Sequence, residues 1–369
     1  CGTGPVTFPA LTVRALRTRA IRVPMKRPLG TSVARMEHAP FLLVELETEQ
    51  GVTGRAHAFC YMDLALPLMR RVLDMVSESI AGQPVDPGAI GRICRTRFTL
   101  IGAQGVIGMA LSALDVACWD AAAQAAGQPL AGFLGATQDE IPAYNSNGLG
   151  LSDPDGLADQ ALELQGEGFD AVKIRLGRPD PADDLKAVRE VRAALAADAP
   201  LMADYNQALS VADAISRGKT LDSEGLTWIE EPVAHDDLPG AARITAALET
   251  PIQLGENFTS PDVMASAVAL KACNYAMPDL MRIGGVTGWL AAAVIADRAG
   301  MRLSSHLYPE VSVHLLAASP TAHWLEYVDW AEPFLAEKLK IANGSTQPPG
   351  RPGTGVEWDE AAVAHYAID

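Results

Sequence analysis

The chain has 369 residues, which exceeds the usual size of a single hydrophobic core. Hydrophobic residues make up 49% and charged residues 20%, which is the balance of a well-packed globular protein. Its 29 basic and 45 acidic residues leave a net charge of −16, which disfavours a nucleic-acid partner because the phosphate backbone would be repelled. No run of about 18 apolar residues and no charged-then-apolar export pattern occurs, so we expect a soluble cytoplasmic protein without a membrane partner.

The chain begins with Cys1-Gly2-Thr3-Gly4-Pro5, which we interpret as an unstructured extension. Its cysteine is one of five that are scattered, odd in number and without a CxxC pair. That distribution argues against a disulfide framework or a thiolate zinc site. We therefore expect reduced thiols at all five positions: Cys1, Cys60, Cys94, Cys118 and Cys273.

The first third of the chain reads as strands followed by helices. Two β-rich stretches lie between Leu11 and Thr48, and residues 51–54 look like a turn between strands. Apolar residues then recur every three to four positions in two helical segments, Leu64 to Ile80 and Gly105 to Ala126. This order predicts a separate α+β domain over residues 1–137.

Beyond residue 137, strands and helices alternate. Helical segments such as Asp184 to Ala196 and Val286 to Ala299 separate eight apolar strands, which predicts a TIM-type barrel over residues 138–332. The segment 333–369, rich in Gly and Pro, is expected to leave the barrel and pack back on the first domain. The expected strands are Ile141 to Ser146, Ala171 to Leu176, Leu201 to Asp204, Thr227 to Glu230, Ile252 to Glu256, Tyr275 to Asp279, Arg302 to His306 and Trp324 to Tyr327.

Three carboxylates follow successive short apolar runs at equal intervals: Asp204, Glu230 and Glu256. Such a repeat fits one strand, one helix and two loops, so the acids should stand at the ends of neighbouring parallel strands. In a barrel these ends meet at one mouth. Three hard oxygen ligands there predict a site for a divalent ion such as Mg²⁺.

Two cations are expected beside these acids. Lys173 and Arg175 are two residues apart on the second strand and so point the same way, into the barrel. They suit an anionic ligand, or they simply neutralise the acids, since structural ion pairs are common. On the third strand Asn206 shares the face of Asp204, where its amide could bind a substrate hydroxyl or could cap the following helix.

A candidate base ends the sixth and seventh strands. Asp279 and His306 should come within reach of each other, and a carboxylate bonded to one ring nitrogen raises the basicity of the other. Glu326 on the eighth strand completes the ring and could stay protonated in so anionic a site. Glu231 should point the opposite way and be structural. The other six histidines we interpret as packed or surface residues: His38, His57, His235, His314, His323 and His365.

Other patterns are weaker. Residues 283–288 (Ile-Gly-Gly-Val-Thr-Gly) are similar to a phosphate loop but lack the spacing of a dinucleotide fingerprint, so we interpret them as a close-packed turn from strand to helix. The absence of HxH and HExxH runs argues against zinc hydrolases. The absence of a GxSxG elbow argues against serine hydrolases of that type.

Together these residues resemble the enolase superfamily, and within it the mandelate racemase subgroup. The resemblance implies a capping domain, a modified (β/α)7β barrel, one Mg²⁺ per subunit, removal of the proton α to a carboxylate, and a homo-oligomer. It covers nearly the whole barrel and is carried by Lys173-Ile174-Arg175, Asp204-Tyr205-Asn206-Gln207, Trp228-Ile229-Glu230-Glu231-Pro232, Gly255-Glu256-Asn257, Met277-Pro278-Asp279, Ile283-Gly284-Gly285-Val286-Thr287-Gly288-Trp289, Ser304-Ser305-His306-Leu307 and Ala322-His323-Trp324-Leu325-Glu326.

The resemblance also implies a role for each group. The three spaced carboxylates would bind the metal, and the Asp279 and His306 dyad would be a base. Glu326 would donate a hydrogen bond to the forming enolate. Lys173 and Ser146 would contact the substrate carboxylate and Asn206 the α-hydroxyl. A lid and a second specificity segment would supply Leu29, Thr31, Met36, Phe59 and Tyr61.

Arg175 departs from the pattern, because racemases of this subgroup place lysine there as a second base. A guanidinium, whose pKa exceeds about 12, cannot act as one. One-base dehydration of a hydroxy or sugar acid therefore suits the residues better than racemisation or epimerisation of a 2-hydroxy acid. An impaired barrel that only binds metal and a small carboxylate is the third reading.

The expected pocket wall is apolar, which argues against a polyhydroxylated substrate. Nearby polar candidates are Arg27, Arg35 and Asn147. The apolar wall comprises Leu29, Met36, Phe59, Leu307 and Val328.

Overall fold

A computed structural model describes residues 7–32, 34–151 and 156–368 of the chain. The predictions for Cys1 and for the leading extension lie outside these residues. The four cysteines that are described carry free thiols and are buried, in agreement with the expected reduced state: Cys60, Cys94, Cys118 and Cys273.

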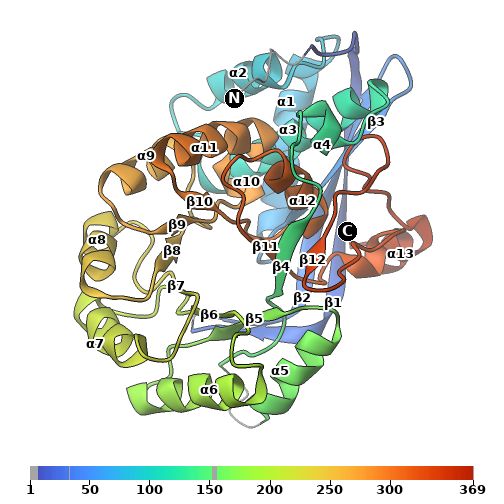
Figure 1. The fold of residues 1–369 in the computed structure, drawn as a ribbon. Helices are drawn as coiled ribbons and strands as arrows, with labels where there is room; N and C mark the ends of the chain where they lie inside the picture. Colours follow the sequence, from blue (N-terminus) through green and yellow to red (C-terminus); the bar gives the residue numbers. More distant parts are fainter. Residues whose placement is uncertain (1–6, 33, 152–155, 369) are drawn as a thin grey trace.

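The N-terminal region folds into an antiparallel sheet with the strand order β1-β2-β3. Its strands are β1 (Val13–Gly30), β2 (Arg35–Thr48) and β3 (Thr53–Phe59), and they extend beyond the ring of the barrel in Figure 1. The third strand begins at Thr53, inside the stretch that was expected to be a turn between strands. The turn itself is shorter and centres on Gly51, whose φ of 84° suits glycine.

Helices cover one side of this sheet. They are α1 (Ala65–Ile80), α2 (Pro87–Arg97), α3 (Gly105–Ala125) and the short α4 (Leu130–Phe133). By length and composition α3 could cross a membrane, but 72% of its most apolar window is buried inside the protein. Its apolar residues pack against β2, β3 and α1, which is the usual position of a core helix.

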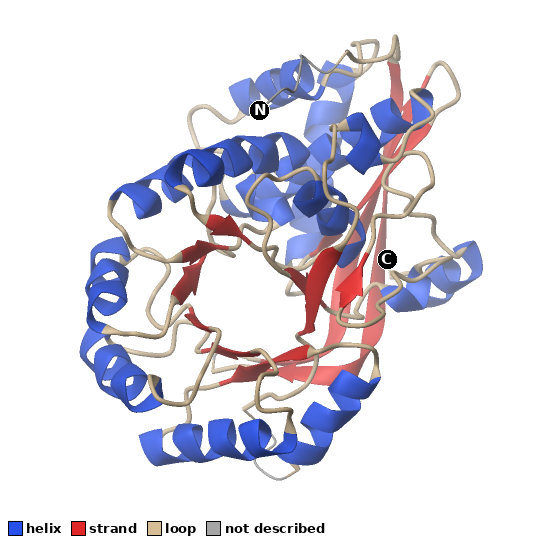
Figure 2. Cartoon of the chain, viewed as in Figure 1, coloured by secondary structure: helices blue, strands red, loops and turns tan. Residues whose placement is uncertain are grey.

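The second region is a ring of parallel strands with helices on its outside (Figure 2). Backbone hydrogen bonds from His323 N to Leu303 O and from Ser305 N to Trp324 O close the ring between its seventh and eighth strands along the chain. The strands are β4 (Ile141–Asn145), β5 (Ala171–Arg175), β6 (Leu201–Asp204), β7 (Trp228–Glu230), β8 (Ile252–Leu254), β9 (Tyr275–Ala276), β10 (Arg302–Leu303) and β11 (Leu325–Tyr327).

The expected strands are all present, and several end earlier than predicted. The outer helices are α5 (Leu157–Gly166), α6 (Pro181–Ala194), α7 (Val211–Leu221), α8 (Leu238–Ala247), α9 (Pro261–Ala269), α10 (Leu280–Ile283), α11 (Gly285–Ala299) and α12 (Pro309–Ala317). The modified barrel with a capping domain is thereby confirmed as the fold class, and the domain limits at residues 137 and 332 stay predictions.

The glycine-rich segment is a close-packed turn, as the sequence indicated, but it connects two helices and not a strand to a helix. It joins α10 to α11, and Gly284 and Gly285 have φ values of 109° and 71°. A Cβ on Gly285 would lie 2.5 Å from an oxygen of Asp115 in α3. That carboxylate accepts the backbone N–H of Thr287, so the capping domain caps a barrel helix directly.

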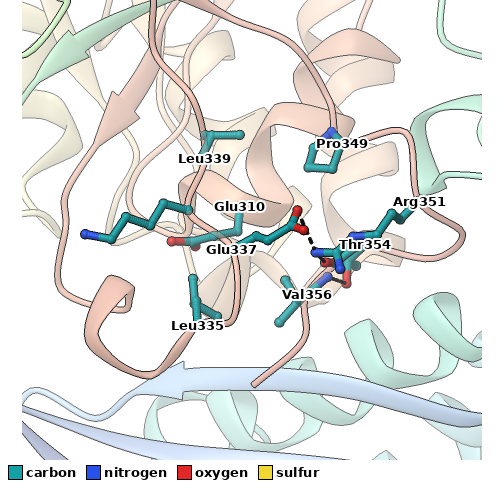
Figure 3. A pocket seen from close by; sticks show the side chains of 10 residues that line it. Glu310, Leu335, Glu337, Leu339, Pro349, Arg351, Thr354 and Val356 are labelled. Carbon is teal, nitrogen blue, oxygen red and sulfur yellow. Dashed lines mark hydrogen bonds and ion pairs between the residues drawn. The ribbon is translucent and has the colours of Figure 1, made fainter. Parts of the chain in front are cut away.

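The C-terminal segment contacts both regions. It contains a 3₁₀ turn (Glu332–Phe334), β12 (Ser345–Thr346), which pairs antiparallel with β4, and α13 (Glu360–Tyr366), which packs on β1. The prediction named only the contact with the first domain. A cavity of about 40 Å³ lies within this segment beside α12, where Arg351 pairs with Glu337 (Figure 3).

Candidate active site

The three spaced carboxylates lie together at the mouth of the barrel. Asp204 ends β6 opposite Glu230, which ends β7, and Glu256 follows β8 by two residues. Each offers an oxygen atom within 4.8 Å of the others. Asp204 and Glu230 are buried, whereas Glu256 is partly exposed.

This donor set fits Mg²⁺. Hard carboxylate oxygens are its preferred ligands, and two ligands on opposite sides of one ion are about 4.2 Å apart, twice the Mg–O distance. The observed limit of 4.8 Å is only slightly larger than that value. Burial also raises the pKa of Glu230 to about 8, although the charge of Lys173 opposes this increase. One ammonium therefore does not fully compensate the negative charge of the cluster, and a bound cation would stabilise it further.

Lys173 from β5 is the central cation of the site. Its Nζ lies 2.7 Å from Glu326, 2.8 Å from Glu230 and 3.3 Å from Asp204. Burial would lower its pKa, but the charges of Glu230, Glu326 and Asp204 raise it above its ordinary value. Lys173 therefore stays an ammonium, and both functions considered for it, neutralising acids and holding an anion, are open to it.

Arg175 lies at the end of the same strand. Its Nη2 donates to Ser146 Oγ at 3.3 Å, and its Nε lies 3.7 Å from Asp204 Oδ2, beyond hydrogen-bond distance. Within the described part of the chain, Nε and Nη1 have no hydrogen-bond acceptor although both atoms are buried. Unpaired buried donors are costly, so these two are suited to an oxygen atom of a ligand.

The protonation state of Glu326, on β11, differs from the prediction that this carboxyl group keeps its proton. It accepts hydrogen bonds from Ser146 Oγ at 2.8 Å and from Leu307 N at 3.0 Å, in addition to the Lys173 contact. Burial alone would raise its pKa, but the charges of Lys173 and His306 and these donors hold the pKa well below its usual range. Glu326 is a carboxylate that fixes Lys173, so the geometry does not support its proposed role as a donor.

Asp279 and His306 form the expected dyad. Both follow the ends of short strands, and a backbone bridge between the two residues sets their side chains at 2.7 Å, Nδ1 to Oδ2. The second oxygen of Asp279 accepts the backbone N–H groups of Met281 and Arg282, which fixes the carboxylate at the start of α10. Asp279 therefore holds the proton on Nδ1, and Nε2 is the free basic atom.

The free nitrogen of His306 points at the carboxylate cluster. Nε2 lies 3.4 Å from Glu256 Oε2 and 3.9 Å from Glu326 Oε2. Burial would lower the pKa of His306, but Glu256, Glu326 and the bond to Asp279 raise it to about 9. A pKa of about 9 means that without a metal ion the ring is mostly protonated at neutral pH. A cation held by the neighbouring carboxylates would offset their charge and favour the neutral ring, which is the form that acts as a base.

Asn206 and Ser146 support this cluster. The backbone N–H and the Nδ2 of Asn206 both donate to Asp204, at 2.8 and 3.1 Å. The helix cap that was the alternative role belongs instead to Ser210, which accepts from Asp213 N. Ser146 connects Arg175 to Glu326, so whether it also contacts a substrate stays a prediction.

The lid predicted from the resemblance is the tip of the β1–β2 hairpin. Leu29 and Met36 face each other across the hairpin and are partly buried, and Thr31 closes the tip through bonds to Ala34. Ser32 Oγ donates to the carbonyl oxygens of Tyr205 and Asn206 at 3.3 and 3.2 Å. The hairpin tip is therefore attached to the mouth of the barrel next to Asp204.

The second specificity segment also reaches the mouth. Phe59 is buried at the end of β3, and its ring lies 4.5 Å from that of Tyr61. The charges of Asp279, Glu256 and Glu326 act on Tyr61, but burial is the main cause that raises its pKa well above its usual value. Its hydroxyl is buried, stays protonated and has no partner among the described residues.

Sequence reasoning missed a group of residues behind Glu256. Asn257 Nδ2 donates to Glu231 at 2.9 Å and to Glu256 at 3.2 Å, and Arg282 donates to Asn257 and covers the ring of Tyr61 at 4.6 Å. Glu231 was expected to face away, but β7 ends before it and its φ of 37° breaks the strand alternation. The sequence did contain a signal: Glu231 and Asn257 each directly follow a candidate metal ligand, and Arg282 follows Asp279 by three residues.

Comparisons with known proteins agree with this geometry. Residues 14–135 match the family model described as mandelate racemase/muconate lactonizing enzyme, N-terminal domain, and residues 156–362 match the model described as enolase C-terminal domain-like. L-talarate/galactarate dehydratase of Salmonella typhimurium is 34% identical over 78% of this chain and 73% of that protein.

Two solved structures are also similar over nearly the full length. An enolase from alpha proteobacterium BAL199 with bound magnesium has a TM-score of 0.94 and 41% identity, covering 97% of this chain and 100% of that one. An enolase from Bradyrhizobium complexed with magnesium and mandelic acid has a TM-score of 0.93 and 39% identity, covering 98% and 100%.

Proposed function

The chain belongs to the mandelate racemase/muconate lactonizing enzyme family of the enolase superfamily, and from this premise we propose that it is a Mg²⁺-dependent dehydratase of a 2,3-dihydroxy carboxylate. The observation that carries the proposal is the Asp279 and His306 dyad, whose free nitrogen lies 3.4 Å from a candidate metal ligand. A base in this position can remove the proton α to a carboxylate bound at the cluster.

His306 performs the first step. Its Nε2 takes the α-proton, and the electron pair of the broken C–H bond moves into the substrate carboxylate, giving an enolate. Asp279 orients the imidazole and stabilises the imidazolium that results, because its carboxylate accepts the Nδ1 proton at 2.7 Å. Bound Mg²⁺ supplies positive charge for the second negative charge of the enolate.

The second step uses the same proton. The electron pair shared by C1 and C2 of the enolate moves to form a double bond between C2 and C3, and the carboxylate is restored. The bond from C3 to the β-hydroxyl breaks, and the hydroxyl takes the proton from His306 and leaves as water. The resulting enol then tautomerises: C3 takes a proton from water and the C2 hydroxyl releases its own proton to water, which gives a 2-keto-3-deoxy acid. Lys173 stays an ammonium throughout and keeps a fixed cation beside the reacting carboxylate.

Arg175 favours dehydration over racemisation. A racemase needs a second base on the opposite face, and a guanidinium does not lose its proton. Its free Nε and Nη1 are instead suited to binding an oxygen atom of the substrate. Relatives named as dehydratases of talarate, galactarate and gluconate support the same reaction class.

Racemisation or epimerisation of a 2-hydroxy acid is the second candidate. The structure from Bradyrhizobium with mandelic acid favours it, since that ligand has an α-hydroxyl and an α-proton but no β-hydroxyl. On this reading His306 would serve one face, and the proton would return from a group other than Arg175.

Incubation with hydroxy acids in D₂O and Mg²⁺ separates the candidates. Dehydration produces a keto acid, whereas racemisation produces α-deuteration with a change in optical rotation. His306→Asn should abolish both signals while Mg²⁺ affinity stays near normal, and an active His306→Asn variant would refute the assignment of the base. Binding without exchange for every acid tested would favour an impaired barrel.

A further inference from the structure

We propose that the substrate is a 2,3-dihydroxy acid whose carbon chain beyond C3 is apolar, an alkyl or aryl group in place of the further hydroxyls of a sugar acid. This inference rests on the proposed function and concerns the same site. It follows from which polar atoms at the barrel mouth are free and which already have partners.

The free polar atoms all lie close to the reacting end. Within the described ranges, the buried atoms around the three carboxylates and the dyad that have no hydrogen-bond partner are Arg175 Nε and Nη1, Asn206 Oδ1 and the hydroxyls of Tyr61 and Tyr144. Arg175 and Asn206 flank Asp204, and Tyr61 is near enough to Asp279 to be affected by its charge. These atoms suffice for a carboxylate and two hydroxyls.

Polar groups that could bind a longer row of hydroxyls are already engaged. Arg27 has a side chain only 9% exposed, and its Nη2 donates to Glu163 at 2.6 Å and to Glu167 at 2.8 Å. Asn147 Nδ2 donates to Asn145 at 2.9 Å, and its oxygen accepts from the backbone N–H of Asp329. A sugar acid would have to break these bonds to gain its own.

Arg35 lies in a different environment from these two. It forms an ion pair with Glu37 at 3.6 Å, and both side chains are more than half exposed on the lid. A pair so close to solvent orients a substrate weakly.

Apolar side chains line the side of the mouth beyond the dyad. Val328 directly follows the end of β11, and Leu307 directly follows His306. Both lie around one small cavity together with Phe59 and Trp330, whose rings are 5.0 Å apart. His57 and Glu310, which contact each other at 3.5 Å, also line this cavity, so its wall is apolar only on the side of Leu307 and Val328. The lid contributes Leu29 and Met36, which pair across the hairpin and are partly buried.

A hydroxyl placed against these side chains would lose its hydrogen bonds to water and gain none in return. Such pockets discriminate against one added hydroxyl by up to about 100-fold. We therefore expect at least a tenfold lower kcat/KM for each hydroxyl added beyond C3.

Two acids with the same six-carbon chain test the inference. The probes are 2,3-dihydroxyhexanoate, as both diastereomers, and hexonates such as gluconate, which add hydroxyls at C4, C5 and C6. Each is incubated with the full chain and Mg²⁺ in D₂O, and both keto-acid formation and α-proton exchange are followed. Three added hydroxyls at tenfold each predict that kcat/KM for a 2,3-dihydroxyhexanoate is at least about 1,000-fold larger than for a hexonate.

The outcomes separate the inference from the function beneath it. If hexonates or hexarates are dehydrated as well as the alkyl acid or better, the inference is overturned and the dehydratase stands. If no acid of either kind gives keto acid or exchange, the proposed function is overturned and the inference with it.

A pair of variants checks that the apolar wall is the cause. Val328→Asn should raise kcat/KM for the hexonate and so reduce the ratio of kcat/KM between 2,3-dihydroxyhexanoate and the hexonate at least tenfold. If Val328→Asn does not fold, Met36→Gln tests the same expectation. Leu162→Asn, on the half-exposed face of α5, is the matched control and should leave the preference unchanged. An unchanged preference in both mouth variants would refute the role of the wall.

Discussion

Asp279→Asn is the most informative single substitution, because it changes the proton on His306 and little else. The amide oxygen can still accept the backbone N–H groups of Met281 and Arg282, now 2.7 and 3.1 Å from Oδ1. The amide nitrogen then replaces the oxygen that faces Nδ1. An amide donor there requires Nδ1 to become an acceptor, which moves the ring proton to Nε2, the atom that should take the α-proton.

The size of the effect follows from the bond that is lost. A hydrogen bond to a charged group contributes about 1.5 to 3 kcal/mol. At about 1.4 kcal/mol per factor of ten, the loss slows proton transfer roughly 10- to 150-fold. This range is a lower limit, because a protonated Nε2 cannot accept a proton until the ring changes tautomer.

The assay is exchange of the α-proton in D₂O at saturating Mg²⁺, followed by proton NMR, with the tautomer of His306 read from ¹⁵N shifts. Mg²⁺ affinity and the melting temperature should stay near those of the parent chain. Asp237→Asn is the matched control, since Asp237 caps α8 in the same way by accepting from Gly240 N at 2.8 Å. Exchange within threefold of the parent rate in Asp279→Asn would refute the proposed role of the dyad.

Three further substitutions give distinct readouts. Arg175→Lys places a group that can lose its proton on the opposite face, so exchange should appear there; unchanged stereochemistry would show that Arg175 does not limit the reaction. Lys173→Met leaves buried carboxylates without their ammonium and should lower the free energy of unfolding in urea by about 3 to 5 kcal/mol, whereas a loss under 1 kcal/mol would mean that the pairing contributes little. Burial lowers the pKa of His314 from 6.5 to about 4, so its contribution to stability is present above pH 6.5 and is lost as pH falls toward 4. The parent should lose about 2 kcal/mol more than His314→Gln between pH 7.5 and pH 5, and equal losses would contradict the shift.

Much of the fold could be predicted because periodicity is a local property. Alternating apolar runs identified the eight barrel strands, and the regular spacing of Asp204, Glu230 and Glu256 placed them at neighbouring strand ends. The dyad followed from the same reasoning, since Asp279 and His306 stand at corresponding positions of adjacent strands. Spacing along a chain translates directly into position around a barrel.

Protonation and pairing could not be predicted in this way. Glu326 was expected to stay protonated, but Lys173, Ser146 and Leu307 approach it from three other segments and hold it ionised. Electrostatic energy depends on distances of a few ångströms between such groups. Strand arithmetic gives the direction of a side chain and not these distances.

The direction of a side chain just beyond the end of a strand could not be predicted either. Glu231 and Asn206 both have positive φ values, so the alternation that oriented them in the prediction had already ended. The contact of the β1–β2 hairpin with Asn206 joins residues more than 170 positions apart.

The sequence by itself determined the family, the barrel and the positions of the three candidate metal ligands and of the candidate base, because each depends on residue type and spacing. Only the tertiary structure decided which polar atoms at the mouth are free and which are paired. That distinction depends on contacts among the lid, the capping sheet and separate barrel strands, and no local pattern in the chain records it.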